Sequence, residues 1–147
     1  MVILELGAGR KLHSDRVNVD MIPGPGIDVV LDLDDHPWPW PDASASDVYA
    51  THIFEHVRDP LGFMEDAHRV LAVGGMLHIE VPHFESPNAF TDPTHLRFCT
   101  PDTFRYWVPD TWLSDITGDL YHRGCLFDEI RNEQIGHDLH VKLRKRP

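Results

Sequence analysis

Short apolar runs divide the first third of the chain into predicted strands. Val2–Leu6 is followed by Gly7, while Val17–Asp20 and Ile27–Asp32 are rich in β-branched residues and each end on an aspartate. Asp47–Ala50 is a further run of this kind. Such runs, ended by turn residues, are typical of buried strands. We therefore predict four strands in this region.

The next segment changes to a helical period. Asp59 can cap a helix and Pro60 suits its first position. The apolar residues that follow keep to one helical face, and Gly74-Gly75 comes after them. The pattern predicts a helix over Pro60–Leu71.

The second half contains three further predicted strands. Met76–Pro82 alternates apolar and polar residues, and Leu126–Ile135 and Asp138–Leu143 are separated by Gly136-His137, which predicts a hairpin. Between them, Thr100-Pro101 opens a short predicted helix that runs to about Trp107. Strands interspersed with helices predict an α/β sheet covered by helices, and such sheets bind ligands at the carboxyl ends of their strands.

Composition fits one domain over residues 1–147. The chain is 41% hydrophobic and 25% charged, with a formal net charge of −11. This acidic balance makes nucleic acid an improbable main partner, because phosphate binding needs clustered Lys and Arg. Two cysteines and the absence of a long apolar run or signal peptide predict a cytoplasmic protein that does not enter membranes.

Glycines and acids stand at the ends of the first three predicted strands. Gly7-Ala8-Gly9 allows a ligand to approach the backbone closely. Asp20 can accept hydrogen bonds from ribose hydroxyls, and Asp32 can accept one from an exocyclic amine while Leu33 packs on a base. Each feature alone is ordinary, but their ordered occurrence points to a nucleoside-containing ligand.

These residues resemble the class I S-adenosylmethionine-dependent methyltransferases, specifically the short bacterial and phage group related to methyltransferase type 11 domains. The resemblance extends over about residues 2–107. Its motifs are Leu4–Gly9, Val17–Asp20, Val29–Leu33, Pro39–Asp42, Tyr49–His56, His68–Gly75, Val81–His83 and Ser86–Phe98.

The resemblance implies a Rossmann-like, mostly parallel sheet with a C-terminal antiparallel hairpin, in a minimal form that lacks the N-terminal helices. It also implies S-adenosylmethionine as cofactor and methyl transfer as the reaction, with an unidentified small or macromolecular acceptor. The implied cofactor residues, from the methionine end through ribose and adenine to the sulfonium, are Glu5, Gly7, Ala8, Gly9, Asp20, Met21, Asp32, Leu33, Thr51 and His52.

The segment 83–112 would cover the acceptor side as a lid. Within it His83, Asp92 and His95 are candidates for a base or a positioning group in methyl transfer. The alternative is that Asp92-Pro93-Thr94-His95 is a turn held by local hydrogen bonds, since Asp and Thr beside Pro favour turns.

Two features depart from the family pattern. Arg10-Lys11 stand where a further glycine is usual, and residues 10–16 are too few for a full crossover helix. We therefore expect an open cofactor cleft, or one completed by a second subunit in a homodimer.

Two other functions compete with this interpretation. His52-Ile53-Phe54-Glu55-His56 matches the His-x-x-Glu-His signature of inverted zinc proteases, but Asp59-Pro60 leaves little room for a helix to carry it, and we expect no metal. The stronger competitor is a non-catalytic binding or assembly module that uses the same fold and exposes part of its aromatic surface to a partner.

Overall fold

The computed structural model describes residues 1–147 and contains one seven-stranded sheet in the order β3-β2-β1-β4-β5-β7-β6. The first five strands run parallel, and β7 pairs antiparallel with both β5 and β6. The strands are β1 Val2–Leu6, β2 Val17–Asp20, β3 Val29–Val30, β4 Ala45–Thr51, β5 Leu71–Pro82, β6 Phe127–Ile135 and β7 Asp138–Lys145. This confirms the Rossmann-like sheet and its C-terminal hairpin.

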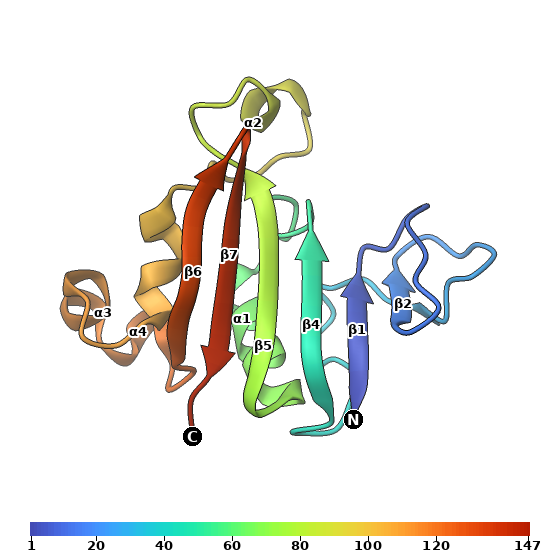
Figure 1. Ribbon diagram of the computed structural model, residues 1–147, viewed down its shortest axis with the longest axis horizontal. Coiled ribbons are helices and arrows are strands. Elements are labelled where there is room, and N and C mark those ends of the chain that lie inside the picture. Colours follow the sequence, from blue (N-terminus) through green and yellow to red (C-terminus); the bar gives the residue numbers. More distant parts are fainter.

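The helices lie behind the sheet or beyond its end (Figure 1). Helix α1 packs behind the central strands, the 3-10 helix η1 packs on the hairpin, α3 and α4 adjoin η1, and α2 lies above the carboxyl ends of the parallel strands. Their bounds are α1 Pro60–Val70, α2 Asn88–Thr91, η1 Pro101–Trp107, α3 Trp112–Thr117 and α4 Asp119–His122. The helices expected over residues 60–71 and 101–107 are thus confirmed, whereas α2, α3 and α4 were not predicted.

The third strand is shorter than its sequence pattern predicts. Only Val29–Val30 pair with β2, because the Asp28 carboxylate accepts a hydrogen bond from the Asn18 amide (2.8 Å) in place of a backbone partner. At the other end, Asp32 accepts from the amide of Asp34 (3.0 Å), which turns the chain away from the sheet. The prediction of a strand over Ile27–Asp32 was therefore wrong at both ends.

Only one face of the sheet is covered, so the expectation that helices cover the sheet holds for half of it. The face toward α1 and η1 carries the fully buried apolar core, which includes Leu4, Leu6, Val48, Ala50, Leu77, Phe127, Leu139 and Leu143. The other face presents polar side chains at matched register, with Glu5 beside Tyr49, Tyr49 beside His78 and His78 beside Lys142. Alternation along the strands separates these two faces.

Aromatic side chains divide between core and surface. Trp38, Phe104 and Trp107 are buried, whereas Phe90, Phe98 and Trp112 are about half exposed or more. None of the helices is long and apolar enough to cross a lipid bilayer.

Candidate functional site

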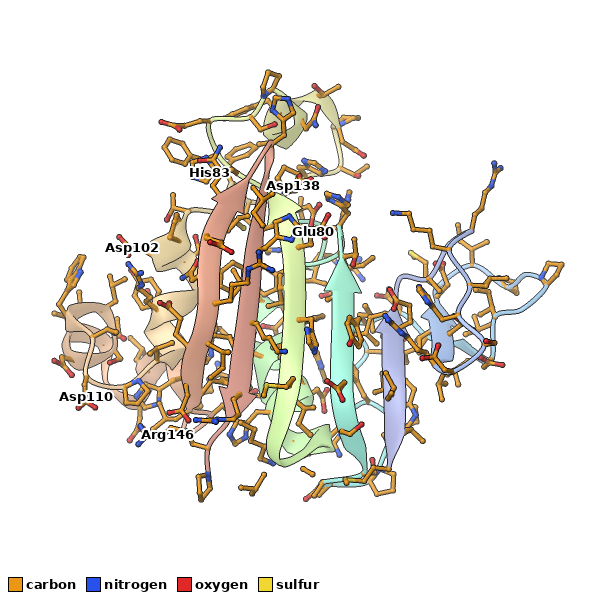
Figure 2. All side chains as sticks on the ribbon, in the orientation of Figure 1. Glu80, His83, Asp102, Asp110, Asp138 and Arg146 are labelled. Carbon is orange, nitrogen blue, oxygen red and sulfur yellow. The ribbon has the colours of Figure 1, made fainter.

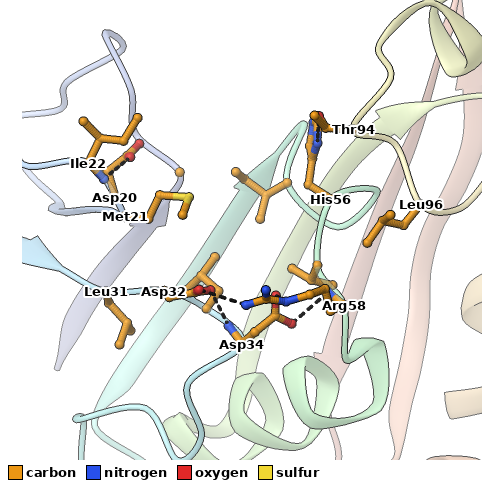
Figure 3. A pocket seen from close by; sticks show the side chains of 14 residues that line it. Asp20, Met21, Ile22, Leu31, Asp32, Asp34, His56, Arg58, Thr94 and Leu96 are labelled. Carbon is orange, nitrogen blue, oxygen red and sulfur yellow. Dashed lines mark hydrogen bonds and ion pairs between the residues drawn. The ribbon is translucent and has the colours of Figure 1, made fainter.

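A cavity of about 590 Å³ opens at the carboxyl ends of the parallel strands (Figure 3). Its floor is formed where β1, β2, β3 and β4 end, and its rim includes two residues of the segment between β5 and η1. The lining residues are Gly7, Asp20, Met21, Ile22, Leu31, Asp32, Leu33, Asp34, Ile53, His56, Val57, Arg58, Thr94 and Leu96. The cavity lies where ligands bind in open α/β sheets.

Asp20 stands at the end of β2 and is held by two backbone amides. Its Oδ2 accepts a hydrogen bond from Gly9 N (2.9 Å) and its Oδ1 accepts one from Ile22 N (2.9 Å). These contacts fix the carboxylate orientation. Each carboxylate oxygen retains a further acceptor position, so Asp20 can still bind hydroxyl groups in the cavity.

Asp32 and Asp34 form an acidic pair bridged by Arg58 (Figure 3). Arg58 Nη2 lies 3.0 Å from Asp32 Oδ2 and its Nε lies 3.2 Å from Asp34 Oδ2. Asp34 Oδ1 also accepts from the amides of Arg58 and Asp59, which anchors the entry to α1. Arg58 itself is largely exposed, so it can move aside from Asp32 at little cost.

Gly7, which lines the cavity, has two properties that depend on its lack of a side chain. Gly7 has φ +65°, and a Cβ on it would lie 1.9 Å from Ile53 Cδ1. Ile53 lines the same cavity. The first glycine after β1 therefore allows both the turn and the close packing of the cavity wall.

The cavity gathers half of the cofactor residues expected from the sequence. Gly7, Asp20, Met21, Asp32 and Leu33 line it, whereas Glu5, Ala8, Gly9, Thr51 and His52 do not. Glu5 instead pairs with Arg16 (2.5 Å), whose guanidinium lies 3.7 Å from the Tyr49 ring centroid. The cofactor residues expected from the sequence did not include His56 or Arg58, which also line the cavity. His56 was singled out only within the His-x-x-Glu-His signature, and the only signal for Arg58 was its place shortly after a strand end.

The three acceptor-side candidates belong to the segment 83–99, which lies at the upper end of the sheet in Figure 1; Figure 2 labels His83 there. His83 is buried and its Nδ1 accepts from Glu85 N (3.3 Å). Asp92 is exposed, and hydrogen bonds from Thr94 lower the pKa of its carboxyl group. His95 is nearly buried at its side chain and contacts Ala89 O through Nδ1 (2.8 Å). None of the three lines the cavity, although Thr94 and Leu96 do.

The His-x-x-Glu-His signature does not lie on a helix. Residues 52–57 form a turn between β4 and α1, and His52 has φ +54°. His52 points toward acids: its Nδ1 lies 3.5 Å from Glu55 Oε1, and its Nε2 lies 3.6 Å from Glu80 Oε1 and 4.0 Å from Asp138 Oδ2. Glu55 first, then Asp138 and Glu80, raise the pKa of His52. The paired histidines of a helical zinc-protease site are absent from this turn.

A model of a known protein family matches the part of the chain that forms the cavity. Residues 7–79 match the model of a methyltransferase domain. This range begins at the first cavity glycine and ends within β5, so it includes the strand ends that form the floor of the cavity. The sequence finds no match among curated proteins.

Solved structures with the same fold cover nearly the whole chain. One chain of the complex between the Haloferax volcanii Trm112 methyltransferase activator and a methyltransferase is 13% identical, with a TM-score of 0.68 over 99% of this chain and 83% of that one. A SAM-dependent methyltransferase from Archaeoglobus fulgidus is 17% identical, with a TM-score of 0.67 over 97% and 85%.

A third structure contains ligands. The 1,6-didemethyltoxoflavin-N1-methyltransferase of Burkholderia thailandensis, solved with 1,6-didemethyltoxoflavin and S-adenosylhomocysteine, is 16% identical, with a TM-score of 0.62 over 99% of this chain and 71% of that one. At these identities the structures establish a shared fold.

Proposed function

The chain belongs to the methyltransferase domain family through residues 7–79, and on this premise we propose that it binds S-adenosylmethionine in the strand-end cavity and transfers its methyl group to an acceptor. The single observation that carries the proposal is that Gly7, Asp20 and Asp32, from three successive strand ends, line one cavity. In a sheet with a different strand order, the same spacing in the sequence would not bring these three residues to one cavity.

The cavity fits the nucleoside half of the cofactor. Its volume of about 590 Å³ lies within the ordinary range for small-molecule sites. The Asp20 carboxylate is fixed by backbone amides and has acceptor capacity for ribose hydroxyls. Met21, Leu31 and Leu33 provide apolar surface for the base, and the Asp32 carboxylate can accept from an exocyclic amine. These contacts would bind and orient the cofactor.

The charge of the lining suits a cationic ligand. Asp20, Asp32 and Asp34 contribute three carboxylates, and Arg58 contributes one opposing guanidinium. When bound, the cofactor supplies an electrophilic methyl group on a positively charged sulfur. Methyl transfer from it is a direct displacement, so the protein's contribution is to orient the two reactants and, where the acceptor needs it, to accept a proton.

The acceptor would approach from the segment 83–112. Thr94 and Leu96 of this segment form part of the cavity rim, which supports its assignment as the acceptor-side lid. We retain His83, Asp92 and His95 as the side chains to test for base or positioning roles. A hydroxyl or amine acceptor would require such a group to take up its proton.

Calorimetric titration of S-adenosylmethionine into the protein tests the cofactor site. Wild type should show saturable binding, and Asp20→Ala should weaken it by about 1–3 kcal/mol because the ribose hydroxyls lose their acceptor. Asp35→Ala, which removes an exposed carboxylate outside the cavity, is the matched control and should bind as wild type does. No heat of binding at millimolar cofactor, or equal losses in both variants, would overturn the proposal.

Methyl transfer itself needs a second assay. Incorporation of a labelled methyl group into cell extracts, with and without the protein, identifies the acceptor class. Cofactor binding without incorporation into any extract would favour the non-catalytic alternative.

We also propose that the protein forms a homodimer. Trp112, Ile116 and Leu120 are each at least 65% exposed and lie on α3 and α4, two helices that contact one another, and large exposed apolar surface is unusual on a monomer. Sedimentation at increasing concentration tests this, and a monomer at the highest concentration would reject it.

A further inference from the structure

Glu55 is a buried carboxylate that accepts no hydrogen bond, and its nearest basic group is His52, whose Nδ1 lies 3.5 Å from Oε1. The residue is 2% exposed, and neither Oε1 nor Oε2 has a hydrogen-bond partner. The guanidinium of Arg97 donates to the carbonyl oxygen of Phe54 and not to Glu55. Burying a charge without compensation is costly, so such a group is normally paired or bound to a metal.

In its neutral form, His95 presents an unprotonated nitrogen to this carboxylate. Its Nδ1 lies 2.8 Å from the carbonyl oxygen of Ala89, which can only accept, so Nδ1 carries the proton. The other ring nitrogen, Nε2, lies 3.9 Å from Glu55 Oε1. Neutral His95 therefore directs a lone pair, and no proton, toward the Glu55 carboxylate.

His56 is held in the same tautomer by a chain of hydrogen bonds. The hydroxyl of Thr94 donates to Asp92 Oδ1 (2.7 Å), a carboxylate whose pKa is lowered and which therefore accepts. Thr94 Oγ1 is then left to accept from His56 Nδ1 at 3.0 Å (Figure 3). This leaves the Nε2 of His56 with a free lone pair, and the His56 and His95 rings meet edge to face with centroids 4.7 Å apart.

From these contacts we propose that Glu55, His56 and His95 form a binding site for a divalent transition-metal ion. One ligand atom from each residue lies within 4.8 Å of the others. Small side-chain rotations would bring these atoms to ligand distances of roughly 2.0–2.2 Å. Two neutral imidazoles and one carboxylate are the donor set of many zinc sites and of non-haem iron sites.

The surroundings have the form of a metal site rather than a simple cluster. Metal-binding histidines usually donate their second ring N–H to a carbonyl or another acceptor, as His95 does to Ala89 and His56 does to Thr94. His56 also lines the strand-end cavity, so three protein ligands would leave coordination positions for a small molecule there. The proposal goes beyond cofactor binding and does not depend on it.

A neighbouring set of side chains provides the internal control. His52, Glu80 and Asp138 also bring their ligand atoms within 4.8 Å of one another, but all three are at least partly exposed, and Glu80 and Asp138 lie on the strands β5 and β7 (Figure 2). These acids already interact with histidines: Glu80 with His52 and His140, and Asp138 with His52. In this second cluster Asp138 Oδ1 also lacks a hydrogen-bond partner, but both acids are partly exposed, whereas Glu55 is 2% exposed.

The test measures Zn²⁺ binding by calorimetry and Co²⁺ binding by visible absorption, on metal-stripped protein without cofactor. Wild type should bind one equivalent. Glu55→Gln and His95→Gln should each lower the affinity more than tenfold, and Thr94→Val, which removes only the acceptor of the His56 proton, should lower it roughly 10–100-fold. Glu80→Gln, in the second cluster, should bind as wild type does.

Glu55→Gln also tests the site through folding. Because Glu55 is buried and its carboxylate accepts no hydrogen bond, the metal-free variant should melt at a temperature no lower than wild type and should lose the metal-induced rise in melting temperature. The proposal is overturned if wild type shows no saturable binding, if Glu55→Gln and His95→Gln bind metal as tightly as wild type, or if Glu80→Gln alone abolishes binding.

Discussion

His68 should make the protein lose stability in mild acid. It lies on α1, with its ring edge to face against Phe127 (5.1 Å between centroids). Burial, together with the positive charge of Lys145, lowers its pKa from 6.5 to about 4. Between these values the unfolded chain binds a proton that the folded chain does not, so stability falls as the pH decreases through about 6.5.

The magnitude follows from the pKa difference. At about pH 5 the unfolded histidine is almost fully protonated and the folded one mostly neutral, which amounts to about 2 kcal/mol relative to about pH 7.5, at roughly 1.4 kcal/mol per pH unit. Solvent screening of the partly exposed ring reduces this to about 1–2 kcal/mol. Urea unfolding followed by tryptophan fluorescence at both pH values measures it.

His68→Gln is the control, since it keeps a polar side chain but does not titrate in this range. The loss of stability between the two pH values should be smaller in the variant than in wild type by about 1–2 kcal/mol. Contributions from other titrating groups are common to both proteins and cancel in the comparison. Equal losses in wild type and variant would refute the reasoning.

Two further predictions concern the cavity wall and its support. Gly7→Ala should weaken cofactor binding more than Gly9→Ala. Both positions have positive φ, but only at Gly7 would a Cβ meet Ile53. Calorimetric titration of the cofactor into both variants measures the two affinities, and equal effects would contradict the prediction. Asp66→Ala should destabilise the fold by about 3 kcal/mol in urea unfolding, because buried Asp66 accepts a hydrogen bond from Arg69. Asp42→Ala removes an exposed partner of Arg69 and should cost under about 1 kcal/mol. Similar losses in these two variants would show that burial of the ion pair is unimportant.

Much of the sheet was predictable because its signals are local. The glycine after Val2–Leu6, Asp20 at the end of the next run and the hairpin turn at Gly136 mark strand ends without reference to the rest of the chain. The helix over residues 60–70 was predictable for the same reason, since its cap, first proline and apolar face all lie within the segment. The extent of β3 was not, because the Asp28 side chain competes with the backbone for the Asn18 amide.

The candidate site was predictable only where a residue's position along a strand determines its place. Asp20 lies at the cavity because it ends β2, and Asp32 does so because it follows the adjacent strand β3 by two residues. Glu5 does not line it, and the alternation of Leu4 and Leu6 with Glu5 was the available signal that this carboxylate faces away from the core. The approach of His95 to Glu55 had no sequence signal, since it depends on how the segment after β5 folds back over the turn after β4.

The uncovered face of the sheet bears on how a second subunit would bind. Arg16 pairs with Glu5 and lies over Tyr49, whose ring stacks on His78 at 4.1 Å. His78 in turn contacts Asp47 (3.0 Å), so the polar groups of this face satisfy one another and water.

A partner placed on this uncovered face would have to desolvate these ion pairs, which costs several kcal/mol unless each is matched again. The apolar side chains of α3 and α4 carry no such cost, and burying Trp112 and its neighbours would release water from exposed apolar surface. The proposed homodimer is therefore better accommodated at α3 and α4. In that arrangement the second copy would leave the polar sheet face in solvent and would not complete the cofactor cleft from that side.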